Sequence, residues 1–283
     1  MKKAPKAYKN PEFLGSPEAR TIRMLAEYLE PESRLKKFNI EDTIVFFGSA
    51  RTRPPAEAQQ KLAGIRQQLQ AGTADSPELA AQLRRAEMDV RTSGYYEDAV
   101  RLAGMLTTWS KELRNKKQCR NRRFIICSGG GPGIMEAANR GASEAGGYSI
   151  GMNISLPYEQ DPNPYISREL MFEFHYFFVR KFWLAYMAKA LIIFPGGFGT
   201  LDEMLELLTL LQTGKITKRM PIIIYGSQYW KEVLNFDAMV KWGMISPEDL
   251  GLFSFCDTPE DAFQYLKTAL APLCNDMPPQ EQP

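Results

Sequence analysis

The sequence contains a single histidine, His175, among 283 residues. This excludes chemistry that needs two histidines, such as a zinc site of the HExxH type. The four cysteines form no CxxC pair and no zinc-ligand spacing, which favours free thiols in a reducing cytoplasm over a disulfide framework. No apolar run approaches the roughly 20 residues that cross a membrane. The first ten residues, MKKAPKAYKN, lack the apolar core of a signal peptide. We therefore expect a cytoplasmic protein with no membrane partner.

The sequence also lacks an excess of charge of either sign. Thirty-five Lys and Arg against 33 Asp and Glu leave a net charge of +2, which gives no electrostatic reason to expect a nucleic-acid partner. The triphosphate-binding pattern GxxxxGK[ST] does not occur. The composition, 44% hydrophobic and 24% charged, is that of a folded globular protein. The length allows one large α/β domain or two small ones.

Short apolar runs alternate with amphipathic segments from residue 43 onward. Such alternation is typical of strands buried on both faces with helices between them. We predict an α/β fold: a Rossmann-like, doubly wound, mostly parallel sheet with helices on both faces. The expected organisation is an N-terminal leader and helix (1–40, the helix over 17–29), the main domain (41–274) and a flexible tail (275–283). The predicted strands are 43–47, 124–127, 148–154, 191–194, 221–225 and, weakly, 252–255.

A helical hairpin is predicted over residues 55–93, inserted after the first strand. Leu62, Ile65 and Leu69 form one apolar stripe, and residues 79–90 carry a second. Because these stripes are narrow, we expect a partner surface to cover them, most simply a second subunit. This favours an assembly element outside the active site, and a lid over the ligand is the alternative.

Two glycine clusters each follow a predicted strand and precede a predicted helix: SGGGPGIME at 128–136 and PGGFGTLDE at 195–203. Glycines let a ligand approach the backbone, and the helix that follows points unpaired N–H groups at it. Phosphate is the usual anion at such a place. Neither cluster fits GxGxxG, and the alternative is that both are tight turns. Asp202 and Glu203 fall in the first turn of the second helix. A carboxylate there can face a ribose and serve glycosidic cleavage.

An aromatic segment, FHYFFVRKFW at 174–183, carries the adjacent pair Arg180 and Lys181. A guanidinium among aromatic rings requires an anionic partner, unless the pair reaches past the rings to solvent. His175 is expected to be a packed core residue, with a catalytic base as the alternative.

These motifs resemble the LOG ("lonely guy") family, often labelled as putative lysine decarboxylases. PGGFGTLDE at 195–203 is similar to the family signature PGGxGTxxE, and Arg180 and Lys181 precede it at the family's spacing. SGGGPGIMEAANRGA at 128–142, GMNISLPYEQ at 151–160 and LTLLQTGK at 208–215 resemble the longer bacterial branch. FGSAR at 47–51 resembles the first strand-end loop. The likeness covers about residues 43–242 without the hairpin.

The resemblance implies a phosphoribohydrolase. Such enzymes cleave the N-glycosidic bond of a nucleoside 5′-monophosphate, AMP or a cytokinin riboside 5′-monophosphate, to free base and ribose 5-phosphate. It implies Arg180 and Glu203 as catalytic residues. The implied substrate contacts are Ser49, Gly130, Gly131, Glu159, Lys181, Gly196, Gly197, Gly199, Thr200, Asp202 and Thr209.

The resemblance further implies a homodimer or higher homo-oligomer. We expect no cofactor and no metal. The decarboxylase label is not supported, because no residues are grouped as a pyridoxal phosphate site requires. The alternative function is a non-catalytic nucleotide-binding or sensing module, which would need the glycine loops but not both Arg180 and Glu203.

Overall fold

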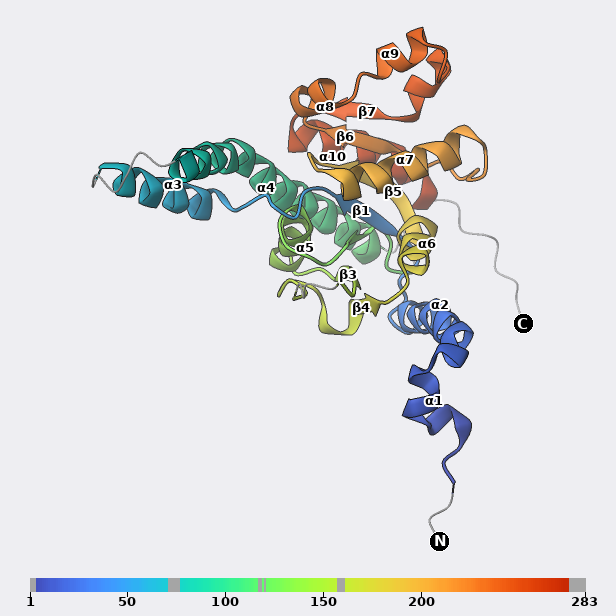
Figure 1. The fold of residues 1–283 in the computed structure, drawn as a ribbon. Coiled ribbons are helices and arrows are strands. Elements are labelled where there is room, and N and C mark those ends of the chain that lie inside the picture. The colour runs from blue at the N-terminus through green and yellow to red at the C-terminus, as the bar shows by residue number, and fades with distance from the viewer. Residues whose placement is uncertain (1–3, 71–76, 117–118, 120, 157–160, 275–283) are drawn as a thin grey trace.

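A seven-stranded, all-parallel sheet forms the centre of the chain (Figure 1). The computed structural model describes residues 4–70, 77–116, 119, 121–156 and 161–274. The strand order is β4-β3-β2-β1-β5-β6-β7. This confirms the predicted α/β fold and every predicted strand. The strands are β1 (Thr43–Phe47), β2 (Ile125–Ser128), β3 (Ser149–Ile154), β4 (Met171–Phe174), β5 (Ala188–Ile193), β6 (Ile222–Tyr225) and β7 (Ser254–Cys256).

The sheet is wound in two directions from its middle. Strand β1 pairs with β2 on one side and with β5 on the other, so that Val45 lies opposite both Cys127 and Leu191. The strand order reverses between β1 and β5, and ligands of open α/β sheets bind at such a switch point, beyond the carboxyl ends of the strands. The loops after β1 and β5 therefore meet where the fold predicts a site.

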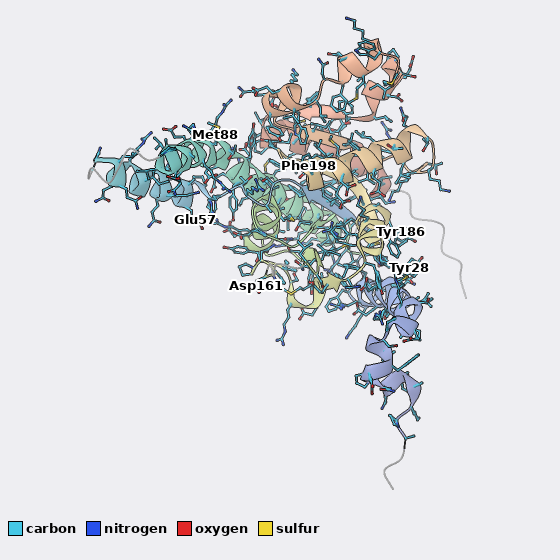
Figure 2. All side chains as sticks on the ribbon, in the orientation of Figure 1. Tyr28, Glu57, Met88, Asp161, Tyr186 and Phe198 are labelled. Carbon is cyan, nitrogen blue, oxygen red and sulfur yellow. The ribbon has the colours of Figure 1, made fainter. Side chains whose placement is uncertain are left out.

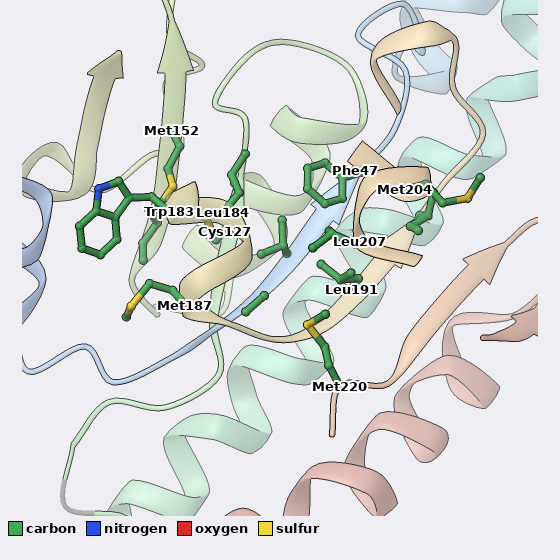
Figure 3. Packing of buried hydrophobic residues seen from close by; sticks show 14 of the residues in the cluster. Phe47, Cys127, Met152, Trp183, Leu184, Met187, Leu191, Met204, Leu207 and Met220 are labelled. Carbon is green, nitrogen blue, oxygen red and sulfur yellow. The ribbon is translucent and has the colours of Figure 1, made fainter. Parts of the chain in front are cut away.

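Helices cover both faces of the sheet. One apolar cluster lies between the sheet and a layer that includes α2, α6 and α7, with Trp183, Met204 and Leu207 fully or nearly buried (Figure 3). The second cluster joins the other face to α4, α5 and α10. The helices of the domain, apart from the hairpin, are α5 (Ile134–Glu144), α6 (Phe177–Met187), α7 (Phe198–Gln212), α8 (Ser227–Val233), α9 (Phe236–Lys241) and α10 (Pro259–Leu270).

The inserted hairpin is formed by α3 (Pro55–Gln70) and the first half of α4 (Pro77–Asn115). It projects from the sheet as an arm (Figure 1). Helix α4 runs past the predicted end at residue 93, because the apolar positions of its second half continue without a break onto the sheet. The two stripes pack on each other, with Ile65, Leu79 and Ala86 buried between them. The expectation that a partner must cover these stripes is therefore wrong.

The N-terminal segment forms α1 (Pro11–Gly15) and α2 (Arg20–Lys37), and short 3-10 turns (Ala7–Lys9, Pro17–Ala19) flank α1. Helix α2 is longer than the predicted 17–29 and continues through the buried Pro31. The Glu27 side chain accepts hydrogen bonds from the backbone N–H groups of His175 and Tyr176. His175 is exposed, so the expectation of a packed core histidine is wrong. The predicted tail, 275–283, lies outside the described residues. No described helix is both long and apolar enough to cross a membrane.

Candidate active site at the carboxyl edge of the sheet

A cavity of about 720 Å³ lies at the switch point between β1 and β5. The loops after β1, β2 and β5 provide part of its lining, together with side chains of α6, α7, α8 and α4. Of the residues named from the sequence, this cavity brings together Ser49, Arg180, Gly196, Gly197, Gly199, Thr200 and Glu203.

The second glycine cluster forms the start of α7. A Cβ atom at Gly196 would lie 2.0 Å from Oγ1 of Thr200, so only glycine fits against that side chain. At Gly197 and Gly199 an added Cβ would meet nothing within 4 Å, so these positions leave open space in front of the helix. The first intrahelical bond runs from the N–H of Leu201 to Gly197. The N–H groups ahead of it at the helix start are the unpaired donors that bind anions.

Ser49 joins the loops around the cavity. Its N–H donates to the carbonyl of Pro195 over 3.0 Å, and its own carbonyl accepts from the N–H of Ile134 over 3.1 Å. Its hydroxyl accepts from the N–H of Arg51 over 3.0 Å. The loops after β1 and β5 and the start of α5 are thereby fixed to one another, which holds the cavity floor in one geometry.

Arg180 and Glu203 form a buried ion pair in this cavity. Nη2 of Arg180, on α6, donates to Oε1 of Glu203, on α7, over 3.0 Å, and the two side chains are 13% and 8% exposed. The guanidinium also lies over the ring of Phe177, 5.1 Å from its centroid. Its Nε is buried and has no hydrogen-bond partner among the described residues. The anionic partner expected for a guanidinium among aromatic rings is thus Glu203.

Burial governs the protonation of this pair. It raises the pKa of the Glu203 carboxyl, and the charges of Arg180 and Lys181 oppose that rise. Burial lowers the pKa of the Arg180 guanidinium, and Glu203 opposes that change. A carboxyl whose pKa is raised is a stronger base once ionised, a property common at catalytic positions.

Lys181 and Asp202 lie beside the cavity instead of lining it. Nζ of Lys181 lies 2.7 Å from Oδ2 of Asp202 and 2.8 Å from Oε2 of Glu206, so its charge is already paired. Thr209 is exposed on α7 and donates its hydroxyl to the carbonyl of Leu205. In the described cavity, none of these three predicted contacts lines the wall.

The first glycine cluster differs from expectation. Gly130 and Gly131 are buried, and the side-chain amide of Asn163 donates to both of their carbonyls. A Cβ at Gly130 would lie 2.3 Å from Oδ1 of Asn153, so this glycine serves close packing. Gly129 lines the cavity in their place. Glu159, also expected to contact the substrate, lies outside the described residues.

Sequence reasoning missed the walls supplied by two other elements. Tyr229 and Val233, on α8, line the cavity, and the Tyr229 hydroxyl donates to the carbonyl of Gly196 over 2.7 Å. Met88, Asp89 and Thr92, on α4, line it as well. The expectation that the hairpin stands outside the site is therefore wrong. A residue just after β6 could have been expected at this edge, whereas no sequence signal placed α4 there.

The described residues offer no obvious metal site, since no three His, Cys, Asp or Glu side chains among them are grouped closely enough. The four cysteines are free and buried. The cavity thus combines the N–H groups at the start of α7, a type of donor that binds anions, with the buried Arg180–Glu203 pair.

The sequence profile of the family described as "Possible lysine decarboxylase" matches residues 135–266. Among curated proteins, the chain is 26% identical over 149 residues to the probable cytokinin riboside 5′-monophosphate phosphoribohydrolase LOG4 of Oryza sativa subsp. japonica. That alignment covers 52% of this chain and 64% of the rice protein. The chain is also 30% identical over 127 residues to cytokinin riboside 5′-monophosphate phosphoribohydrolase LOG7 of Arabidopsis thaliana. That alignment covers 44% of this chain and 56% of the Arabidopsis protein. Over these residues the chain is similar to LOG proteins.

The matched part spans about three-fifths of the length of these LOG relatives. Among solved structures, the Moco carrier protein from Chlamydomonas reinhardtii is similar, with 18% identity and a TM-score of 0.43 over 82% of this chain and 99% of that one. The residues matched by that family profile include Arg180 and the loop 195–203, whereas the hairpin precedes them. The cavity is thus lined partly by residues within the matched range and partly by the inserted hairpin.

Proposed function

We propose that this protein is a nucleoside 5′-monophosphate phosphoribohydrolase, which hydrolyses the N-glycosidic bond to a free base and ribose 5-phosphate. The observation that carries the proposal is the buried Arg180–Glu203 pair in the same cavity as the glycine loop of α7. Curated LOG relatives that carry this activity in their names support it. AMP and cytokinin riboside 5′-monophosphates are the proposed substrates.

In this proposal the 5′-phosphate binds at the start of α7. The free N–H groups at the start of that helix lie beside the space that Gly197 and Gly199 leave open, and Thr200 lines the same cavity. Glu203 lies five residues further along α7, about 7 Å at 1.5 Å per residue. That separation suits a ribose between the phosphate and the carboxylate. Binding of the phosphate then fixes the ribose for reaction, although the phosphate is remote from the bond that breaks.

The ionised carboxylate of Glu203 faces the anomeric carbon. As the bond from that carbon to the base nitrogen breaks, its electron pair leaves with the base and positive charge develops on the ribose. Glu203 stabilises this charge or takes a proton from the attacking water, whose oxygen bonds to the anomeric carbon. One water proton ends on the nitrogen of the departing base, so hydrolysis adds H to the base and OH to the ribose. Arg180 holds Glu203 in place, and its charge opposes the rise in the pKa of that carboxyl that burial causes.

The direct test is incubation of the purified chain with a panel of nucleoside 5′-monophosphates that includes AMP and isopentenyladenosine 5′-monophosphate, with adenosine as the control lacking phosphate. Chromatography of the free base and an assay of ribose 5-phosphate measure the two products. We expect both in equal amounts from at least one monophosphate, and a much lower rate from adenosine.

Binding of AMP without cleavage of any monophosphate would contradict the hydrolase and favour the non-catalytic nucleotide-binding module. Equal rates on adenosine and AMP would contradict the assignment of the glycine loop as a phosphate site. The same panel decides which base the pocket accepts.

A further inference from the structure

The hairpin contributes three residues of α4, Met88, Asp89 and Thr92, to the lining of the cavity. Helix α4 is anchored at the sheet edge by Tyr95, whose ring packs edge-on against Tyr225 at the end of β6, and by Tyr96, whose hydroxyl donates to Glu136 over 2.7 Å. Met88 and Thr92 lie one to two turns before this anchor and line the cavity, as do Tyr229 and Val233 of α8. Figure 2 shows Met88 on the projecting arm. The cavity thus includes both the start of α7, where the phosphate is proposed to bind, and α4 of the hairpin.

A second cavity, of about 320 Å³, lies next to the first between the hairpin and the start of α5. Ala50, Arg51, Thr52 and Asp89 line both cavities, so the second one borders the same loop that joins the glycine clusters. Its cations are Arg51, Arg53, Lys61 and Arg85. Arg51 and Arg53 belong to the loop that enters the hairpin. Lys61 lies on α3 and Arg85 on α4.

The carboxylates around the second cavity already have partners. Asp89 accepts a hydrogen bond from Nζ of Lys61 over 2.7 Å, and Glu136 accepts one from Tyr96. Glu57 lies 3.8 Å from Arg53. Arg51 and Arg85, by contrast, have no carboxylate partner among the described residues. Although three carboxylates line this cavity, each already has a partner, so the guanidinium groups of Arg51 and Arg85 are suited to bind a phosphate from outside.

We propose that the hairpin forms a second phosphate subsite, and that this chain binds nucleoside 5′-diphosphates more tightly than the monophosphates. The inference rests on the proposed function only for the position of the first phosphate at the start of α7. The second phosphate extends from there toward the hairpin and is bound by Arg51 and Arg85. The hairpin thus selects the length of the phosphate chain, while the loops at the sheet edge and α7 hold the nucleoside.

Isothermal titration calorimetry with AMP, ADP and inorganic pyrophosphate tests the subsite by binding alone, without reference to cleavage. We expect ADP to bind about tenfold more tightly than AMP, as one added charge-assisted contact provides. Arg85→Ala should bring the ratio of ADP affinity to AMP affinity close to one and should weaken the binding of pyrophosphate. Arg84→Ala is the matched control, because Arg84 is the neighbouring arginine on α4, is exposed as Arg85 is, and lies outside both cavity linings.

Equal or weaker binding of ADP would overturn the subsite. An equal loss of ADP affinity in Arg84→Ala would also overturn it, because general surface charge would then explain the binding. The two proposals fail separately. If AMP is bound but no nucleotide is cleaved, the proposed hydrolase activity is wrong, while the ratio of ADP affinity to AMP affinity still tests the subsite. If AMP is cleaved and the ratio is one, the hydrolase stands without the subsite.

Discussion

The sheet edge and the hairpin meet at the cavity and differ in how far their charged side chains are buried. At the sheet edge, the charged pair Arg180 and Glu203 is buried, and the loops around it are joined by backbone hydrogen bonds through Ser49. On the hairpin, the ion pairs are more exposed, as between Arg66 and Glu87, and a small apolar cluster of its own holds the two helices together. Burial makes electrostatics strong in the first region, whereas water screens it in the second. We therefore expect chemistry at the edge and adjustable binding at the hairpin.

The largest effect should follow from Glu203→Gln. Glutamine still accepts the hydrogen bond from Arg180, but it carries no charge for the anomeric carbon and no basic oxygen for water. We expect kcat for nucleoside monophosphate cleavage to fall by about 10² to 10⁴, with the affinity for the monophosphate largely kept. Glu206→Gln, one turn further along α7 and exposed, is the matched control and should stay near wild type. Near-normal turnover of Glu203→Gln would shift the catalytic role to Asp202.

A smaller, local effect should separate the stability of the two regions. Ile65→Ala removes a buried side chain from the cluster inside the hairpin, a change that costs about 2 kcal/mol or more in a core. We expect amide hydrogens of α3 and the first half of α4 to exchange about 30-fold faster, because 1.4 kcal/mol corresponds to a factor of ten. The midpoint of global thermal unfolding should barely move.

Leu106→Ala is the control for the hairpin variant. Leu106 is fully buried between α4 and the sheet, so its truncation should lower the global midpoint. If Ile65→Ala lowers that midpoint as much, the hairpin unfolds together with the sheet, and the distinction between the two regions fails.

The sheet could be predicted from the sequence because its central strands are buried on both faces and form continuous apolar runs. Strand β4 was missed, since at the sheet edge it alternates buried Phe172 with exposed Glu173. The glycine loop of α7 and the pair Arg180 and Glu203 were predictable from residue type and the resemblance. The packing role of Gly130 was not, because it depends on Asn153 of β3 and on Asn163 of the segment after it, both distant from Gly130 in the sequence.

The path of the hairpin could not be predicted either. Its two stripes show that the helices are amphipathic, but not that they face each other. Nor does periodicity reveal where a projecting helix passes a cavity. The position of Met88, Asp89 and Thr92 follows from the anchoring of Tyr95 and Tyr96 at the sheet edge, which is a tertiary contact.

The smallest expected effect concerns the pH dependence of cleavage. Burial raises the pKa of Glu203, and the charge of Lys181 opposes that rise. Lys181→Gln removes the opposing charge, so the pKa of Glu203 rises further and the ionised form is reached only at higher pH. The acid limb of the profile of kcat/KM against pH should therefore move to higher pH. A partly screened charge pair is worth about 0.5 kcal/mol, so the rate on the acid side should fall about two- to threefold more than the rate at the optimum.

Arg66→Gln is the matched control, since it removes one positive charge from an exposed pair on the hairpin. It should leave the acid limb in place, because water screens that charge from Glu203. The profile is measured with steady-state kinetics on AMP, or on whichever monophosphate the panel selects, in buffers of constant ionic strength. A limb that moves to lower pH in Lys181→Gln would contradict the assignment of Glu203 as the group that must be ionised. An equal shift in Arg66→Gln would mean that charge on the hairpin acts on the chemistry as strongly as charge at the sheet edge.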